Sequence, residues 1–242
     1  MARKSAYRRG YAVAVLVGLE EGIAVIWKVY SKVVKPETTL KLEEKRNNSK
    51  AVYSFHETIV NILRPTLKEG VRTVVLASPQ RTSYTREFIE YVNRHHAWLT
   101  QKPNKVTFAE ITDSASTFPQ VTALTRNPVF SKLIQKATSE ETLGLLDLME
   151  SRLSGSQGDK AVLYSLDDVE AAVLGSHWRG LSPEHLLLTD KYLVTSRQKD
   201  RLNRLMQISA NKKIKTRVVD AESPAGKRLT QLGGIVCLTR AQ

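Results

Sequence analysis

The sequence is poor in cysteine and has no long uninterrupted apolar segment. Its one cysteine, Cys237, excludes an internal disulfide and a zinc site built from cysteines. No stretch approaches the roughly 20 apolar residues that a membrane-spanning helix needs. The apolar run after the basic N-terminus stops at Glu20 and Glu21 without a small-residue cleavage signal. We therefore expect no secretory signal and a cytoplasmic protein.

Motifs for nucleotide cofactors and metal ions are also missing. The chain contains no Walker motif and no glycine-rich dinucleotide-binding loop, so we expect no nucleotide cofactor. His95 and His96 are adjacent, but no Asp, Glu or Cys stands near them at the spacing of metal ligands. We interpret these histidines as surface or RNA-facing side chains, and we expect no metal site.

Positive charge is the most marked feature of the composition. The formal net charge is +13. Lys and Arg in such excess displace counterions from nucleic-acid backbones, which indicates an RNA partner. The densest cluster runs from Arg197 to Arg217, where eight basic residues stand against one acid, Asp200. A solvated surface without a partner is the alternative interpretation of this cluster.

Strand and helix patterns follow one another in two different orders. Residues 10–117 contain three strand-like segments, the first two joined at Gly18–Gly22, and then helix, strand, helix and strand. This order predicts a mixed sheet covered by helices. Residues 118–242 begin with helical segments and then alternate strands with helices, which predicts a mostly parallel sheet. We therefore expect an α/β protein of two small domains, preceded by a basic arm at residues 1–9.

The helix predicted from Ser196 to about Ala210 carries both an apolar stripe and a basic stripe. Arg197, Arg201 and Arg204 are spaced i, i+4 and i+7 and therefore fall on one face. Such a helix would pack its leucines on the sheet and present its guanidinium groups outward. Contact with RNA phosphates is the functional interpretation, and solubility is the alternative.

Several segments of the second half occur in the order and spacing typical of one protein family. The segments are Ala161–Gly175 (AVLYSLDDVEAAVLG), Leu186–Asp190 (LLLTD) and Gly233–Val236 (GGIV), preceded by Thr125–Ile134 (TRNPVFSKLI). With a looser match in the first half, they resemble the central and C-terminal domains of Pelota and the class-1 eukaryotic and archaeal release factors. The resemblance covers roughly residues 10–240.

This resemblance implies an RNase H-like central domain at residues 10–117 and a C-terminal domain at residues 118–242. It also implies a protein that works on the ribosome. The family's N-terminal domain, which reads the decoding site, has only the basic arm of residues 1–9 in its place. We therefore expect that the chain does not recognise a stop codon in the family's way.

The polar loop before the first long helix departs from the release factors. In those proteins this loop carries Gly-Gly-Gln, which places a water at the peptidyl-tRNA ester. The matching stretch here, residues 45–52 (KRNNSKAV), has neither glycine nor glutamine. Ester hydrolysis needs a backbone that can approach the ester and a donor that positions water. As in Pelota, which also lacks the tripeptide, we expect no catalytic residue and no enzyme activity.

The main hypothesis is an RNA-binding factor that docks on the ribosome and acts by occupancy in hibernation, rescue or quality control. Its expected partner is ribosomal RNA, with tRNA and a translational GTPase or ATPase as further candidates. Two alternatives stay open: a peptidyl-tRNA hydrolase that uses a non-standard residue, and an RNA-binding module that acts off the ribosome.

The candidate RNA-binding residues lie in the basic arm, the polar loop, a loop that pairs an aromatic ring with a cation, and the basic cluster. An aromatic ring in a loop suits base stacking, and cations suit phosphate contacts. The candidates are Arg3, Lys4, Arg8, Arg9, Lys45, Arg46, Asn47, Asn48, Lys50, Trp178, Arg179, Arg197, Arg201, Arg204, Lys212, Lys213 and Lys215.

Overall fold

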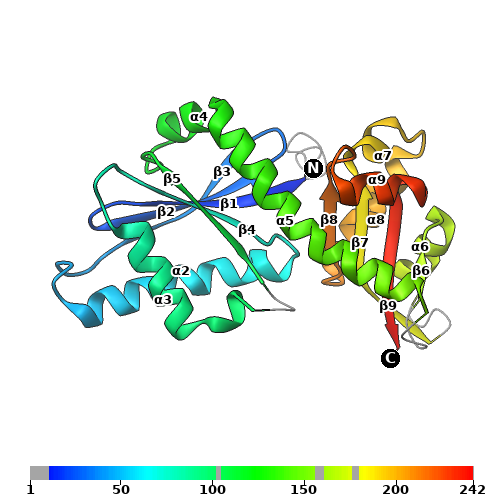
Figure 1. Ribbon diagram of the computed structural model, residues 1–242, viewed down its shortest axis with the longest axis horizontal. Helices are drawn as coiled ribbons and strands as arrows, with labels where there is room; N and C mark the ends of the chain where they lie inside the picture. The colour runs from blue at the N-terminus through cyan, green and yellow to red at the C-terminus, as the bar shows by residue number, and fades with distance from the viewer. Residues whose placement is uncertain (1–10, 102–104, 156–160, 176–179, 242) are drawn as a thin grey trace, which may run out of the picture. The chain divides into compact units, whose positions relative to one another are not determined.

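A computed structural model of the chain describes residues 11–101, 105–155, 161–175 and 180–241. The chain divides into two compact units, Met1–Leu67 with Val71–Glu141 and Lys68–Gly70 with Thr142–Gln242. Each unit has one β-sheet with helices on both faces (Figure 1). The predicted α/β fold with two sheets is confirmed.

The first unit contains a five-stranded mixed sheet in the order β3-β2-β1-β4-β5. Strands β1, β2 and β3 pair antiparallel, whereas β4 pairs parallel with both β1 and β5, so the predicted mixed sheet is confirmed. The strands are β1 (Ala12–Leu19), β2 (Ile23–Tyr30), β3 (Val34–Lys41), β4 (Thr73–Ser78) and β5 (Thr107–Thr112).

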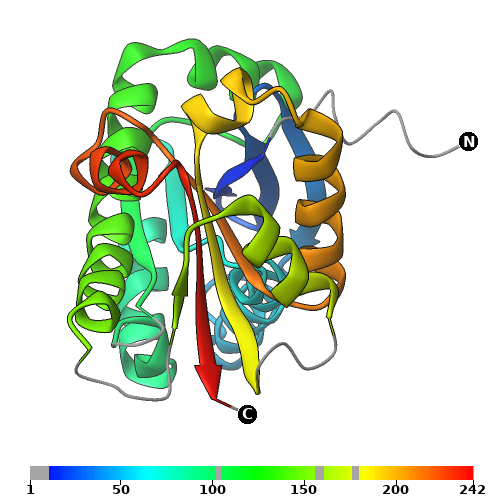
Figure 2. The ribbon, with the colours of Figure 1, turned by 90° about the vertical axis from the view of Figure 1, so that its right-hand side faces the viewer.

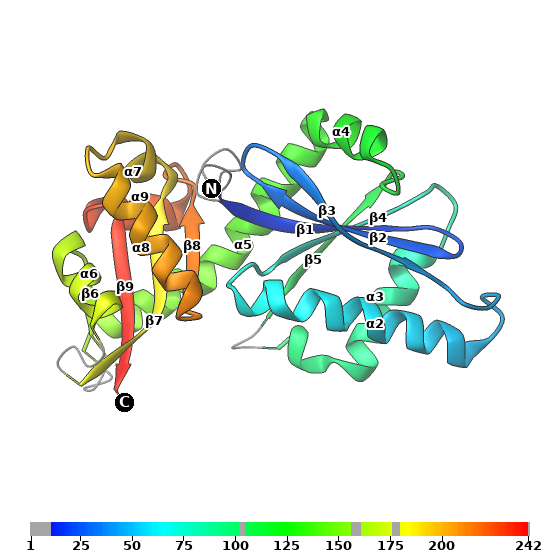
Figure 3. The ribbon, with the colours of Figure 1, turned by 180° about the vertical axis from the view of Figure 1, so that it is seen from behind.

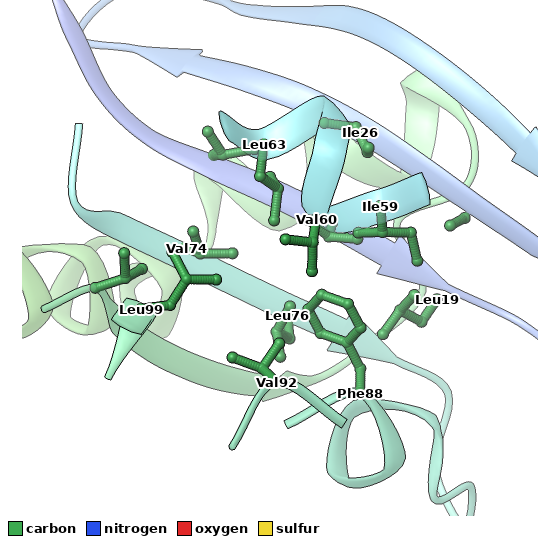
Figure 4. Close-up of a cluster of buried hydrophobic side chains, with 14 of the residues drawn as sticks. Leu19, Ile26, Ile59, Val60, Leu63, Val74, Leu76, Phe88, Val92 and Leu99 are labelled. Carbon is green, nitrogen blue, oxygen red and sulfur yellow. The ribbon is translucent and has the colours of Figure 1, made fainter. Parts of the chain in front are cut away.

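Helices cover both faces of this first sheet. The helices are α2 (Ser49–Lys68), α3 (Tyr84–His95), the short 3-10 helix η1 (Ala97–Leu99), α4 (Phe118–Arg126) and α5 (Pro128–Leu153). On one face, apolar side chains of α2 recur at helical spacing and pack with α3 on the sheet (Figure 4). Ile59, Leu63 and Phe88 are almost completely buried there.

The other face of the first sheet packs against α4 and the beginning of α5. Val121, Leu124 and Phe130 are buried against residues of β1, β2 and β4. The division between the two compact units falls inside α5, after Glu141. The order of predicted elements places the domain boundary at residue 117, which stays a prediction. Helix α5 is also continuous. The run Ser139-Glu140-Glu141, with acids where a first helical turn would be, instead predicts a separate helix start there.

The second unit contains a four-stranded sheet in the order β6-β9-β7-β8. The strands are β6 (Val162–Leu163), β7 (Leu181–Thr189), β8 (Lys215–Val219) and β9 (Ile235–Ala241). Only β7 and β8 pair parallel, because β9 runs antiparallel to both of its neighbours. The sheet is therefore mixed, and the prediction of a mostly parallel sheet is wrong.

The connection before β9 explains this reversal. Helix α9 (Pro224–Gln231) has eight residues and extends only about 12 Å. That is shorter than the roughly 17 Å of the five-residue strand β8 that precedes it. Gly233 and Gly234, with φ of 98° and 85°, then turn the chain directly into β9. The strand consequently runs back beside β7.

The two faces of the second sheet are covered by different helices (Figure 2). Helices α6 (Leu166–Leu174) and α8 (Lys199–Asn211) cover one face, and α9 with the end of α5 covers the other. Ser165, followed three residues later by Asp168, has the sequence pattern of a helix start. The structure confirms it, because the Ser165 Oγ accepts a hydrogen bond from the Asp168 amide at 3.1 Å. Helix α8 begins at Lys199 rather than Ser196, and the short α7 (Asp190–Thr195) has no counterpart among the predicted elements.

No helix within the described ranges is both long and apolar enough to cross a membrane. The same part of the chain holds no group of three or more His, Cys, Asp or Glu side chains that could bind a metal ion.

Gly226 in α9 lies where the backbone leaves no room for a side chain. A Cβ at this position would stand 1.9 Å from the Asp220 carbonyl oxygen and 2.7 Å from the Ala221 Cα. Both atoms belong to the backbone and cannot rotate away, so the contact requires glycine.

We expect Gly226→Ala to lower the free energy of unfolding of the second unit by about 1–3 kcal/mol, because the backbone must shift. Gly144→Ala is the matched control, since it changes a helical glycine of α5 that has no atom within 4 Å. It should stabilise the unit by roughly 0.5–1 kcal/mol. Urea unfolding measures both, and equal effects would contradict the close approach at Gly226.

Candidate RNA-binding surfaces

Two groups of predicted RNA-binding residues lie outside the described part of the chain. They are the basic arm and the loop that pairs an aromatic ring with a cation, with the residues Arg3, Lys4, Arg8, Arg9, Trp178 and Arg179. Their role stays a prediction.

The polar loop of residues 45–50 is held by its own side chains at the start of α2. The Asn48 Oδ1 accepts hydrogen bonds from the backbone amides of Lys50 and Ala51, at 3.0 and 3.3 Å. An oxygen in this position satisfies amides at the beginning of the helix, which otherwise have no partner. Lys45, Asn47 and Lys50 are exposed. Asn48 therefore has a structural role here, whereas the exposed residues remain available to a partner.

Arg46 is bound inside the first unit. Its Nε donates to the Glu21 carbonyl at 2.7 Å, and its Nη1 donates to a Glu87 carboxylate oxygen at 2.5 Å. The guanidinium carbon also lies 3.9 Å from the centre of the Tyr84 ring. The side chain is only 18% exposed. Arg46 thus connects the polar loop to the β1–β2 turn and to α3, and few of its donors remain for a phosphate.

His56, in the second turn of α2, is buried with an exposed fraction of 3%. Burial, aided by the positive charge of Arg46 and opposed by a smaller effect of Glu87, lowers the pKa of His56 to about 4. Its Nε2 has no hydrogen-bond partner within the described residues. The imidazole is therefore neutral at physiological pH and belongs to the core beneath the loop.

In the second unit, Arg201 connects two helices. Its guanidinium donates to Glu170 at 2.6 Å and to Asp167 at 2.5 Å, both on α6, and to Gln198 at 2.6 Å. The hydrogen bonds to Glu170 and Asp167 raise the pKa of Arg201. Since α8 begins at Lys199, Arg197 precedes the helix. The predicted basic stripe is thus divided, and Arg201 turns toward α6.

Lys212 and Lys215 are also partly engaged. The Lys212 Nζ lies 3.4 Å from the Leu174 carbonyl and 3.2 Å from the Gly175 carbonyl, at the C-terminal end of α6. A cation there stabilises carbonyl groups that the helix leaves unpaired. Lys215 is half-buried on β8. Neither side chain is fully available to a partner.

Four cations on α8 and its flanks are exposed, and their side chains form no hydrogen bond or ion pair with another described residue. We call them the α8 cations: Arg197, Lys199, Arg204 and Lys213. Helix α8 lies beside α6 on one face of its sheet (Figure 3). Lys199 is absent from the residues selected from the sequence, although it belongs to the same basic cluster. Ion pairing in the folded chain, which composition does not reveal, separates these four from Arg201.

Acid should destabilise the first unit through His56. The unfolded histidine takes up a proton below about pH 6.5, and the folded one only near pH 4. The contribution of neutral His56 to the free energy of unfolding is therefore complete above pH 6.5 and is lost as the pH falls toward 4. We expect a loss of about 2 kcal/mol between pH 7.5 and 5. In urea unfolding, the stability of His56→Phe should not show this loss at low pH, whereas the exposed-site control His95→Gln should show it. An unchanged dependence in His56→Phe would contradict the assignment.

Arg46→Gln should lower the free energy of unfolding of the first unit by about 1–3 kcal/mol, because charge-assisted hydrogen bonds to Glu87 and to the Glu21 carbonyl are removed. The neighbouring exposed Lys45→Gln is the control and should change it by less than about 0.5 kcal/mol. Thermal and urea unfolding of the two variants provide the measurement. Similar stabilities would show that Arg46 is not a structural residue.

Comparison with solved structures shows which known fold the chain shares. S. cerevisiae Dom34, a translation termination-like factor involved in RNA quality control pathways and interacting with Hbs1, is 21% identical over 95% of this chain, with a TM-score of 0.53. Archaeal Pelota, in a ribosome-bound structure with ABCE1, is 19% identical over 100% of this chain, with a TM-score of 0.56. The chain covers 62% and 65% of the length of these two proteins.

Sequence comparisons add no closer relationship, since neither a protein-family model nor a curated protein sequence matches the chain. An archaeal translation termination factor, aRF1, aligns over 94% of the chain, but its TM-score of 0.33 supports no conclusion. The chain therefore has the fold of Dom34 and Pelota over nearly its whole length, and the resemblance predicted from the sequence is confirmed at the level of the fold.

Proposed function

We propose that the chain is a ribosome-binding factor that acts by occupying its site, in ribosome hibernation, rescue or quality control. The observation that carries this proposal is the fold shared with Pelota and Dom34 over nearly the whole chain. One of these structures is a ribosome-bound Pelota with ABCE1, and Dom34 interacts with Hbs1. By analogy, the ribosome is the proposed main partner, and a translational GTPase or ATPase is the proposed second partner.

The distribution of positive charge supports a ribosomal RNA partner. The chain has a formal net charge of +13, and the α8 cations are exposed and unpaired among the described residues. Exposed Lys and Arg side chains neutralise phosphates and release counterions, which gives affinity without sequence specificity. The exposed Lys45 and Lys50 of the polar loop provide a second point of contact in the first unit.

The polar loop supports an action without ester hydrolysis. Its sequence lacks the glycines and the glutamine that release factors use. Arg46 and Asn48 also bind this loop to the rest of the first unit through hydrogen bonds. A water-positioning loop must present a donor at the ester and approach it closely. We therefore propose that the chain binds without cleaving peptidyl-tRNA.

Neutralising the α8 cations together should reduce the salt dependence of ribosome binding. In the variant Arg197→Gln, Lys199→Gln, Arg204→Gln and Lys213→Gln, we expect the slope of log affinity against log salt to fall by about 3, because each phosphate that a cation neutralises contributes roughly 0.7–0.9 to the slope. Co-sedimentation with ribosomes at several salt concentrations measures the slope. A variant with four exposed lysines of the first unit changed to Gln (Lys32, Lys41, Lys132 and Lys136) has the same net charge and serves as control.

An equal decrease of the slope in both variants would show general attraction rather than a defined surface. A chain that stays free of ribosomes at low salt but retards structured RNA would favour the module that acts off the ribosome. Steady release of peptide from peptidyl-tRNA on large subunits would contradict the non-enzymatic mode.

A further inference from the structure

Aromatic, histidine and charged side chains form a continuous row between α2 and the segment of α3 and η1 in the first unit. We call this row the aromatic seam. It consists of Tyr53, Glu57 and Arg64 on α2 and of Tyr91, His95, His96 and Trp98 on and after α3. None of these residues contributes to the surfaces described above, and most of them are polar, so core packing alone does not explain the arrangement.

Glu57 is the centre of the seam. Its Oε2 accepts hydrogen bonds from the Tyr91 hydroxyl at 2.5 Å and from the His96 Nε2 at 2.7 Å. The hydrogen bond from Tyr91 lowers the pKa of Glu57, outweighing its partial burial, and His96 and Arg64 lower it further. Burial and the same hydrogen bond raise the pKa of Tyr91. Because the Glu57 carboxylate accepts both hydrogen bonds, it fixes the orientation of the Tyr91 and His96 rings.

Two rings attached to this network are exposed. Trp98 is 39% exposed, and its Nε1 donates to the His96 Nδ1 at 3.4 Å. Tyr53 is 47% exposed, and its ring stands edge to face with Tyr91 and His95, at centroid distances of 5.2 and 5.1 Å. These rings are therefore held in place while a large part of their surface remains in contact with water.

A guanidinium with unused donors lies beside one of these rings. The Arg64 carbon stands 5.5 Å from the centre of the Trp98 ring. The nearest carboxylate oxygen, on Glu57, is 4.0 Å from Nη2, and the Nε is buried without a hydrogen-bond partner among the described residues. The side chain is 41% exposed, so its Nη groups can donate to a ligand without breaking a short ion pair.

Ordered exposed aromatic rings with an adjacent arginine are the elements with which proteins bind unpaired bases. Every base can stack on an aromatic ring, and an arginine can hold the neighbouring phosphate or stack itself. A duplex offers no free base faces along its length, so such a site selects single strands. A protein partner could also cover exposed rings, but the positive charge of the chain favours a polyanion.

We propose that the aromatic seam is a binding site for single-stranded RNA, in which Tyr53 and Trp98 stack with bases and Arg64 contacts the backbone. The choice of RNA over protein rests on the proposed function, but the site is separate from the α8 cations. It would allow the first unit to hold an unpaired stretch of RNA on or off the ribosome.

The test uses the full chain and two labelled probes, an oligouridine of about 12 nucleotides and an RNA duplex of about the same length. Fluorescence anisotropy gives the affinity at several salt concentrations. We expect Tyr53→Ala and Trp98→Ala each to weaken oligouridine binding about ten-fold or more. The salt slope should stay unchanged, because neither variant removes a group that neutralises a phosphate. Tyr164→Ala is the matched control, since this tyrosine of the second unit is 58% exposed.

The conservative variants Tyr53→Phe and Trp98→Phe keep a ring and should retain most of the affinity. Affinities of the alanine variants within two-fold of the unchanged chain would overturn the proposal. Equal weakening for duplex and single strand, or equal losses in Trp98→Phe and Trp98→Ala, would also overturn it. The assay contains no ribosomes, so normal oligouridine binding by a chain that does not sediment with ribosomes would contradict only the proposed function.

Discussion

Pairing between arginines and carboxylates connects the elements of each unit, and it decides which positive charges remain on the surface. In the second unit, Arg152 of α5 is buried, and it donates to the Thr239 carbonyl of β9 at 2.8 Å and to Glu184 of β7 at 2.7 Å. Burial alone would raise the pKa of Glu184, but the hydrogen bond from Arg152 and the surrounding positive charges outweigh it and hold the pKa below its usual value. Loss of either partner would leave a desolvated charge, which makes such a pair a strong constraint on the arrangement.

The same principle separates two classes of cation in a chain with a large positive excess. Arg46 and Arg201 are bound within the fold, where they join a loop to a hairpin and one helix to another. Arg204 and Lys213 make no such contact within the described residues and remain exposed. A guanidinium that is already saturated by carboxylates would have to break those bonds before it could bind a phosphate. The exposed class is therefore the better candidate for RNA contact.

The extent to which the sequence predicted the fold differs between the units. The helix predicted after the third strand and the capping pattern of Ser165 depend on local properties, and the structure has both, as α2 and the start of α6. The direction of β9 depends on the length of α9 and on the turn at Gly233, and the alternation of strands and helices does not encode either. Trp98 follows the end of α3, in η1, where it is partly exposed, and local periodicity does not encode this placement.

The sequence by itself determined the α/β class, the mixed first sheet, the positive charge and the resemblance to Pelota, because these follow from composition, local periodicity and the order of short motifs. The tertiary structure alone decided the mixed direction of the second sheet, the internal pairing of Arg46 and Arg201, and the assembly of the aromatic seam. Tyr53 and Trp98 stand far apart in the chain and belong to one network only because α2 packs beside α3. Contacts between distant residues depend on how the elements pack, and that information is absent from any single segment.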